Sequence, residues 1–118
     1  MRTSPNRVYE ALMSSKKFSA FTGDAAEISS EPGGSFTGFG GRIVGRNIEL
    51  IPSKRIVQAW RSTTWESGVY SIVRFELQGE GSETRLIMDH TGFPDDQREH
   101  LESGWNMRYW EPLKKYLS

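Results

Sequence analysis

The sequence predicts one α+β domain, in which two short helices, an antiparallel sheet and a long C-terminal helix follow one another along the chain. The chain has 118 residues, which is the length of a single domain, and its apolar residues are spread from end to end. Near both ends of the chain these residues recur at helical spacing. Between residues 26 and 91, alternating segments are separated by closely spaced turn residues, a pattern typical of an antiparallel meander.

Two short helices are predicted near the N-terminus. The first begins at Ser4 and Pro5, because serine caps free backbone N–H groups and proline at the first helical position loses no hydrogen bond. A second helix is predicted from about Ser15 to Phe21, followed by Gly23, since a left-handed glycine commonly ends a helix. The apolar residues of the first helix are Val8, Tyr9, Leu12 and Met13.

A series of strands is predicted between the helices. They cover residues 27–30, 35–39, 42–51, 55–62, 69–78 and 83–91, which are rich in β-branched and aromatic residues or alternate in polarity. Turns rich in glycine and proline separate them, among them 32–34, 40–41, 52–54 and 79–82. Alternation places Tyr70, Ile72, Arg74 and Glu76 on one face of their strand, and Leu86, Met88 and His90 together on one face of the next.

The last element is predicted to be one amphipathic helix from about Gln97 to Leu117. Its apolar face includes Leu101, Trp105, Tyr109, Pro112 and Tyr116, spaced three to four residues apart. Gly104 and Pro112 lie inside it and disfavour a helix by about 1 and about 3 kcal/mol, respectively. Because Pro112 cannot donate to the carbonyl of Arg108, we expect a kink there.

Composition argues against several function classes. The chain has 15 basic and 15 acidic residues, so it lacks the basic excess typical of nucleic-acid binders. It has no cysteine, which excludes disulfides and thiol chemistry and fits a cytoplasmic location. No apolar run suggests a signal peptide or a membrane span. His90 and His100 have no metal-ligand spacing with an acid, so neither a metal nor another cofactor is expected.

Several short motifs, taken in their order, resemble one family. The chain contains Gly33-Gly34-Ser35-Phe36, then Phe39-Gly40-Gly41, then Ile56 to Arg61 (IVQAWR), and Gly104-Trp105 ahead of Tyr109 to Lys114 (YWEPLK). In this order they resemble the C-terminal domain of activators of the heat-shock protein 90 (Hsp90) ATPase, in the START-like (SRPBCC) superfamily. The resemblance implies a helix-grip fold, in which a curved antiparallel sheet wraps around the long C-terminal helix. It also implies Hsp90 as a partner, whose ATPase the domain would modulate.

The chain departs from that family in two ways. The family's fold begins with a strand before the Ser-Pro helix, whereas only Met1 to Ser4 precede Pro5 here. We therefore expect an exposed sheet edge, which favours a dimer or strand exchange. The eukaryotic relatives also carry a separate N-terminal domain that makes much of the chaperone contact, and this chain has no room for it. ATPase modulation is therefore kept as the alternative function.

The first hypothesis is a non-enzymatic module that binds a hydrophobic or amphipathic small molecule between sheet and helix. Buried Trp and Tyr side chains seek hydrogen-bond partners and suit a half-polar cavity. His90 or Arg108 would anchor the polar end of the ligand, and the glycine-rich hairpin would act as a lid. The predicted lining is Trp60, Phe75, Leu86, Met88, His90, Trp105, Arg108, Tyr109, Pro112 and Tyr116, and the predicted lid is Gly33, Gly34, Phe36, Phe39, Gly40 and Gly41.

Other interpretations of the same residues stay open. The aromatic rings can simply fill the core, and His90 can be a histidine whose hydrogen bonds are satisfied at the end of a strand. No catalytic residue is predicted, because no Gly-x-Ser-x-Gly motif or Ser/His/Asp arrangement is present. A START-like cyclase or hydrolase is a third alternative. It would need two converging carboxylates, whereas Glu49, Glu66, Glu76 and Asp89 are more simply exposed charges.

Overall fold

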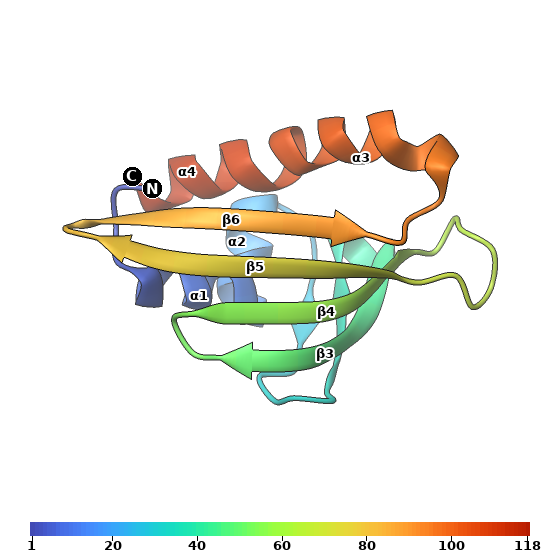
Figure 1. The fold of residues 1–118 in the computed structure, drawn as a ribbon, viewed down its shortest axis with the longest axis horizontal. Coiled ribbons are helices and arrows are strands. Elements are labelled where there is room, and N and C mark those ends of the chain that lie inside the picture. Colours follow the sequence, from blue (N-terminus) through green and yellow to red (C-terminus); the bar gives the residue numbers. More distant parts are fainter.

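A computed structural model describes residues 1–118 and shows one six-stranded antiparallel meander with helices packed on one face (Figure 1). The strands lie in the sheet in their order along the chain. They are β1 (Glu27–Ile28), β2 (Ser35–Gly38), β3 (Ile43–Ile51), β4 (Arg55–Ser62), β5 (Ser71–Glu80) and β6 (Glu83–Thr91). This confirms the predicted α+β helix-grip architecture.

The two N-terminal helices, α1 (Pro5–Met13) and α2 (Ser15–Thr22), begin where the sequence predicts. The side-chain oxygens of Ser4 and Ser14 accept hydrogen bonds from the backbone N–H groups of Arg7 and Lys17, which satisfies free donors in each first turn. Gly23 ends α2 with φ 80°, in the left-handed region that favours glycine.

The strand boundaries differ from prediction mainly at β5 and the turn after it. Strand β5 starts two residues later than predicted and continues through Gly79 and Glu80, which pair with Thr84 and Glu83. The turn therefore shrinks to Gly81 and Ser82. Glycine weakens a strand but does not forbid one, and the ladder to β6 holds Gly79 in place.

A bulge in β3 falls next to a buried asparagine. The register between β3 and β4 shifts between Asn47 and Glu49. Asn47 is 1% exposed, and its amide nitrogen donates to the carbonyl oxygens of Ser29 and Glu31 over 2.7 and 3.2 Å. The amide of Gln58 donates to its side-chain oxygen over 3.2 Å. These bonds tie the glycine-rich segment between β1 and β2 to the middle of the sheet.

The C-terminal helical run is continuous but not uniformly α-helical. A 3₁₀ turn, η2 (Asp95–Gln97), leads into α3 (Arg98–Gly104), a π-helical segment, η3 (Trp105–Trp110), and α4 (Glu111–Leu117). The backbone N–H of Glu111 donates to the carbonyl of Asn106, five residues back. Pro112 has no N–H to donate to Arg108, and the helix accommodates this by widening immediately before the proline.

The first residues of the chain cover part of the sheet edge that the sequence leaves bare. Met1 and Thr84 exchange two backbone hydrogen bonds of 2.8 Å, and the hydroxyl of Thr84 donates to the carbonyl of Thr3 over 2.6 Å. Because inward- and outward-facing backbone groups alternate along an antiparallel strand, those of Leu86, Met88 and His90 face outward on the same edge.

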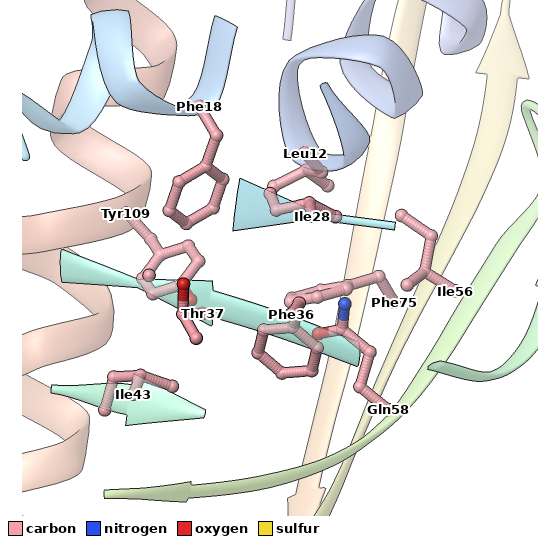
Figure 2. Close-up of a pocket in the computed structure, with 11 residues that line it drawn as sticks. Leu12, Phe18, Ile28, Phe36, Thr37, Ile43, Ile56, Gln58, Phe75 and Tyr109 are labelled. Atoms are coloured by element: carbon pink, nitrogen blue, oxygen red, sulfur yellow. The ribbon is translucent and has the colours of Figure 1, made fainter. Parts of the chain in front are cut away.

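The interior between sheet and helices is filled. Figure 2 shows side chains from α1, α2, strands β1 to β5 and η3 converging on one residual cavity of about 10 Å³. A space of that size holds at most one water molecule. Phe75, Phe36 and Tyr109 are among the rings that close it.

None of the helices combines the length and the apolar character needed to cross a membrane.

Candidate functional site

An open groove of about 230 Å³ lies at the end of the sheet where β4 finishes and the C-terminal helical run begins. It runs between the helical residues Gln97 to Tyr109 and the neighbouring parts of η1 (Phe39–Gly41), β3 and β4. Its apolar lining is Phe39, Ile43, Trp60, Trp65, Leu101, Trp105 and Tyr109. Its polar lining is Arg42, Ser62, Thr64, Gln97, His100 and Arg108.

Stacked aromatic rings form the apolar wall of the groove. The ring centroids of Trp60 and Trp105 are 5.7 Å apart in a stacked arrangement, and those of Trp60 and Trp65 are 5.8 Å apart. The ring centroid of Tyr109, on the next turn of the helix, lies 4.3 Å from that of Trp105. All four residues are buried, so the wall is a packed, fixed surface.

A chain of hydrogen bonds behind this wall joins the helix to three strands. The indole N–H of Trp105 donates to Nδ1 of His90 over 3.1 Å, and Nε2 of His90 lies 2.7 Å from the hydroxyl of Ser71. The Ser71 hydroxyl donates to the carbonyl of Trp60 over 2.7 Å. Nδ1 of His90 accepts the bond from Trp105 and therefore carries no proton. The Ser71 hydroxyl donates its proton to Trp60, so Nε2 of His90 must donate to the Ser71 oxygen. His90 is thus neutral, with its proton on Nε2.

Burial lowers the pKa of His90 from 6.5 to about 4, because the partly desolvated ring disfavours the charged form. The hydrogen bond from Trp105 also requires an unprotonated Nδ1. His90 therefore satisfies its hydrogen bonds inside the fold, and it is not among the residues that line the groove. The structure supports the interpretation of His90 as a satisfied histidine at the end of a strand.

Two indole N–H groups in the wall have no acceptor. The Nε1 atoms of Trp60 and Trp65 are buried and make no hydrogen bond. A buried donor without a partner costs about 1–3 kcal/mol. Burial also raises the pKa of Tyr109, and the nearby Trp60 N–H offsets part of that rise without reaching hydrogen-bond geometry.

The loop that carries Trp65 is held by an arginine. Arg61 donates to the carbonyl oxygens of Val69, Trp65 and Glu66 over 3.2, 2.9 and 3.2 Å. These bonds fix the backbone of the β4–β5 connection, so Trp65 stays packed against Trp60. The sequence gives Arg61 no such role, because its acceptors are carbonyl groups that any residue provides.

The structure brings together only part of the predicted lining. Trp60, Trp105, Arg108 and Tyr109 line the groove, and Phe39 joins them from the predicted lid. The other predicted lining residues, which lie outside the groove, are Phe75, Leu86, Met88, His90, Pro112 and Tyr116.

These outlying residues, and the rest of the predicted lid, have other places in the fold. Phe75 is in the filled core, and Tyr116 is 39% exposed beside Phe21. The remaining lid residues lie outside the groove. Phe36 packs in the core, and the backbone N–H groups of Gly33 and Gly34 bond to the carbonyl oxygens of Asn47 and Glu31. Gly40 and Gly41 lie in η1.

Several groove residues were not predicted from the sequence. Arg42, Trp65 and Leu101 reach the site from a turn, a loop and the start of the helix, respectively. Trp65 lies in a polar loop. A large apolar side chain is unusual there, and this is the one sequence signal that could have indicated the residue. Nothing in the local sequence of Arg42 distinguishes it from other exposed arginines.

Comparison with known proteins gives a consistent result across sequence and structure. Residues 2–118 match the family model described as activator of Hsp90 ATPase homolog 1-like protein. The human activator of 90 kDa heat shock protein ATPase homolog 1 is 30% identical over 113 residues, which are 96% of this chain and 33% of that protein. A Dictyostelium discoideum homologue is 34% identical over 98% of this chain and 30% of its own length. The chain thus spans about a third of these relatives.

Solved structures share the fold at lower identity. The crystal structure of an HSP90 activator from Plasmodium falciparum superposes with a TM-score of 0.93 at 23% identity, covering 98% of this chain and 89% of that one. The solution structure of the Aha1 dimer from Colwellia psychrerythraea gives a TM-score of 0.76 at 19% identity, covering 90% and 82%. With a family match over nearly its whole length, the chain belongs to the family of activator of Hsp90 ATPase homolog 1-like proteins.

Proposed function

We propose that this chain is a co-chaperone module that binds Hsp90 and modulates its ATPase. The observation that carries the proposal is the family match over residues 2–118, together with relatives whose names describe them as activators of that ATPase. Those relatives are about three times as long as the matched region, so the module corresponds to one part of them.

The outer face of the sheet, opposite the helices, is the candidate contact surface. It carries Tyr70 and Ile72, which are 51% and 42% exposed, beside a row of ion pairs that includes Arg74 with Asp89 and Arg55 with Glu76. Exposed aromatic and β-branched side chains within a polar surrounding are typical of a protein-binding patch. No helix of this chain covers that face (Figure 1).

Steady-state ATP turnover by purified Hsp90, with inhibitor-resistant background subtracted, tests the proposal. We expect turnover to change as the chain is added and to reach a plateau. With a double variant, Tyr70→Ser with Ile72→Ser, a higher concentration of the chain should be needed to reach that plateau. Met107→Ser, at a 66% exposed position on the C-terminal helix, is the matched control. Unchanged turnover at saturating chain would contradict the proposal.

Small-molecule binding in the groove is the second candidate function. It is favoured by the groove's volume of about 230 Å³ and its aromatic wall, whereas the interior cavity is too small for a ligand. Ligand pockets commonly span about 300–1,000 Å³, so this groove suits a small molecule that remains partly exposed. A ligand that binds only the folded chain raises its melting temperature, and a panel of small apolar compounds without any such rise would count against this function.

A further inference from the structure

The groove carries an uncompensated positive charge. Arg42 and Arg108 both line it, and neither guanidinium makes an ion pair or a hydrogen bond to another side chain or to the backbone. By contrast, Arg55 and Arg74 on the outer face are paired with carboxylates. The guanidinium groups at the groove are thus free to bind an external partner.

No acidic residue lines the groove to balance those arginines. Its 14 lining residues include two arginines and a histidine but neither Asp nor Glu. The chain as a whole has no net formal charge, so this excess is local. A cleft with one sign of charge and low-dielectric walls concentrates counter-ions of the other sign.

The same groove offers an apolar, flat-walled surface beside the charge. Trp60 and Trp105 are stacked at 5.7 Å, and Trp65 packs against Trp60. Aromatic walls favour flat apolar groups, and guanidinium groups favour planar carboxylates, to which they can donate two parallel hydrogen bonds. The two features together require a ligand with both an apolar body and an anionic end.

We propose that the groove binds a small amphipathic carboxylate, with its apolar body against Trp60, Trp65 and Trp105 and its carboxylate on the guanidinium groups of Arg42 and Arg108. This inference rests on the second candidate function, ligand binding in the groove, and adds the chemical class of the ligand. Because the interior is filled, the body must fit the groove itself, whose volume of about 230 Å³ suits a fused two-ring system.

A matched set of probes tests the charge requirement directly. The ¹⁵N-labelled chain is titrated with naphthalene-2-carboxylate, with the neutral naphthalene-2-methanol and with the cationic 2-naphthylmethylammonium, while the indole N–H signals are followed. We expect the acid to shift the signals of Trp60, Trp65 and Trp105 more than that of Trp110, which lies outside the groove. The acid should bind about tenfold more tightly than the alcohol, since one charge-assisted hydrogen bond commonly contributes that much.

Charge-removing variants locate the carboxylate. Arg42→Gln and Arg108→Gln should each reduce the affinity for the acid several-fold and leave the affinity for the alcohol unchanged. Arg85→Gln is the matched control, because Arg85 is exposed on β6, makes no ion pair or side-chain hydrogen bond, and lies away from the groove. Unchanged dispersion of the amide spectrum confirms that each variant is folded. Higher salt should reduce the affinity for the acid and not the affinity for the alcohol, because salt screens charge interactions.

The outcomes separate the two levels of the proposal. Equal affinity for acid, alcohol and ammonium, or acid binding that neither arginine variant weakens, would overturn the anionic assignment and leave the groove as a general apolar site. No shift with any of the three probes would overturn the assignment together with the second candidate function. Acid binding that is lost in the arginine variants and kept in Arg85→Gln would support it.

Discussion

The indole N–H of Trp105 donates to Nδ1 of His90 over 3.1 Å, and this bond fastens the C-terminal helix to the last strand of the sheet. The acceptor must be the unprotonated nitrogen, so docking of the helix and protonation of His90 oppose each other. Two further hydrogen bonds, from Nε2 of His90 to Ser71 and from Ser71 to the carbonyl of Trp60, keep the same tautomer in place. A side chain that could have been a general base is thereby used to hold the wall of the groove.

The first prediction concerns the pH dependence of stability. The pKa of His90 is lowered from 6.5 to about 4 by burial, so between these values the unfolded chain binds more protons than the folded one. Stability should therefore be fully present above about pH 6.5 and decrease as the pH falls toward about 4. Because His90 is only partly buried, we expect a loss of about 1–2 kcal/mol.

Urea denaturation at a series of pH values measures this loss. His90→Gln is the matched control, because glutamine keeps a donor and an acceptor but does not titrate. Other groups, such as Glu10, whose pKa is lowered by its hydrogen bond to Lys17, titrate in both proteins and cancel in the difference. Parallel stability curves for the two proteins between pH 6.5 and 4 would refute this prediction.

The second prediction isolates the Trp105 hydrogen bond. Trp105→Phe keeps an aromatic ring but removes the N–H, leaving Nδ1 of His90 without its donor, and should cost about 1–3 kcal/mol. Loss of a bond that favours the neutral imidazole should also raise the pKa of His90 toward 6.5, which NMR titration of the ring detects. A purely structural role would leave that pKa in place.

Trp110→Phe is the matched control for this experiment. Trp110 is half-buried, stacks on Trp105 with ring centroids 5.6 Å apart, and makes no side-chain hydrogen bond. Its replacement should cost less and leave the His90 titration unchanged. Equal costs and equal titration curves for the two variants would show that the hydrogen bond contributes nothing measurable.

The third prediction compares two glycines with opposite surroundings. A Cβ at Gly45 would lie 1.9 Å from the carbonyl oxygen of Ala59 and 2.8 Å from the ring of Phe36, so Gly45→Ala requires backbone movement between β3 and β4. We expect a loss of more than about 2 kcal/mol or failure to fold. A fully folded Gly45→Ala with unchanged melting temperature would disprove the close approach of these strands.

Gly104 is the opposite case. It has φ −63°, and a Cβ there would meet nothing within 4 Å. Gly104→Ala should stabilise the chain by up to about 1 kcal/mol, because alanine is the better helix former. The added methyl group would face the groove and should weaken binding of naphthalene-2-carboxylate at the same time. Calorimetry of the free variant and one ligand titration measure both effects.

The fold was largely predictable because local signals and packing agree. Serine caps, proline at the first helical position and Gly23 mark the N-terminal helices. β-Branched and aromatic residues mark β4, and alternation marks β5 and β6. The π-helical segment was not predicted, since only the helix context shows how the chain adapts to Pro112. The backbone pairing of Met1 with Thr84 was also missed, because three residues carry no strand pattern of their own.

The site was predictable only in part. Helical periodicity placed Trp105 and Tyr109 on the helix face that lines the groove, and the aromatic content pointed to a wall. Which rings fill the core and which line an opening depends on the curvature of the sheet, so the sequence could not show that Phe75 packs in the interior and Trp60 lines the groove. Contributions from loops, such as Trp65 and Arg42, depend on tertiary contacts between segments far apart in the sequence.

Direct binding to Hsp90 tests the central claim most sharply. The ¹⁵N-labelled chain is mixed with increasing amounts of unlabelled Hsp90, and amide signals are followed residue by residue. We predict saturable loss of intensity concentrated around Tyr70 and Ile72 on the outer face, with Tyr70→Ser and Ile72→Ser reducing it. A spectrum that stays unchanged when the chaperone is in excess would contradict the proposal that this domain acts on Hsp90.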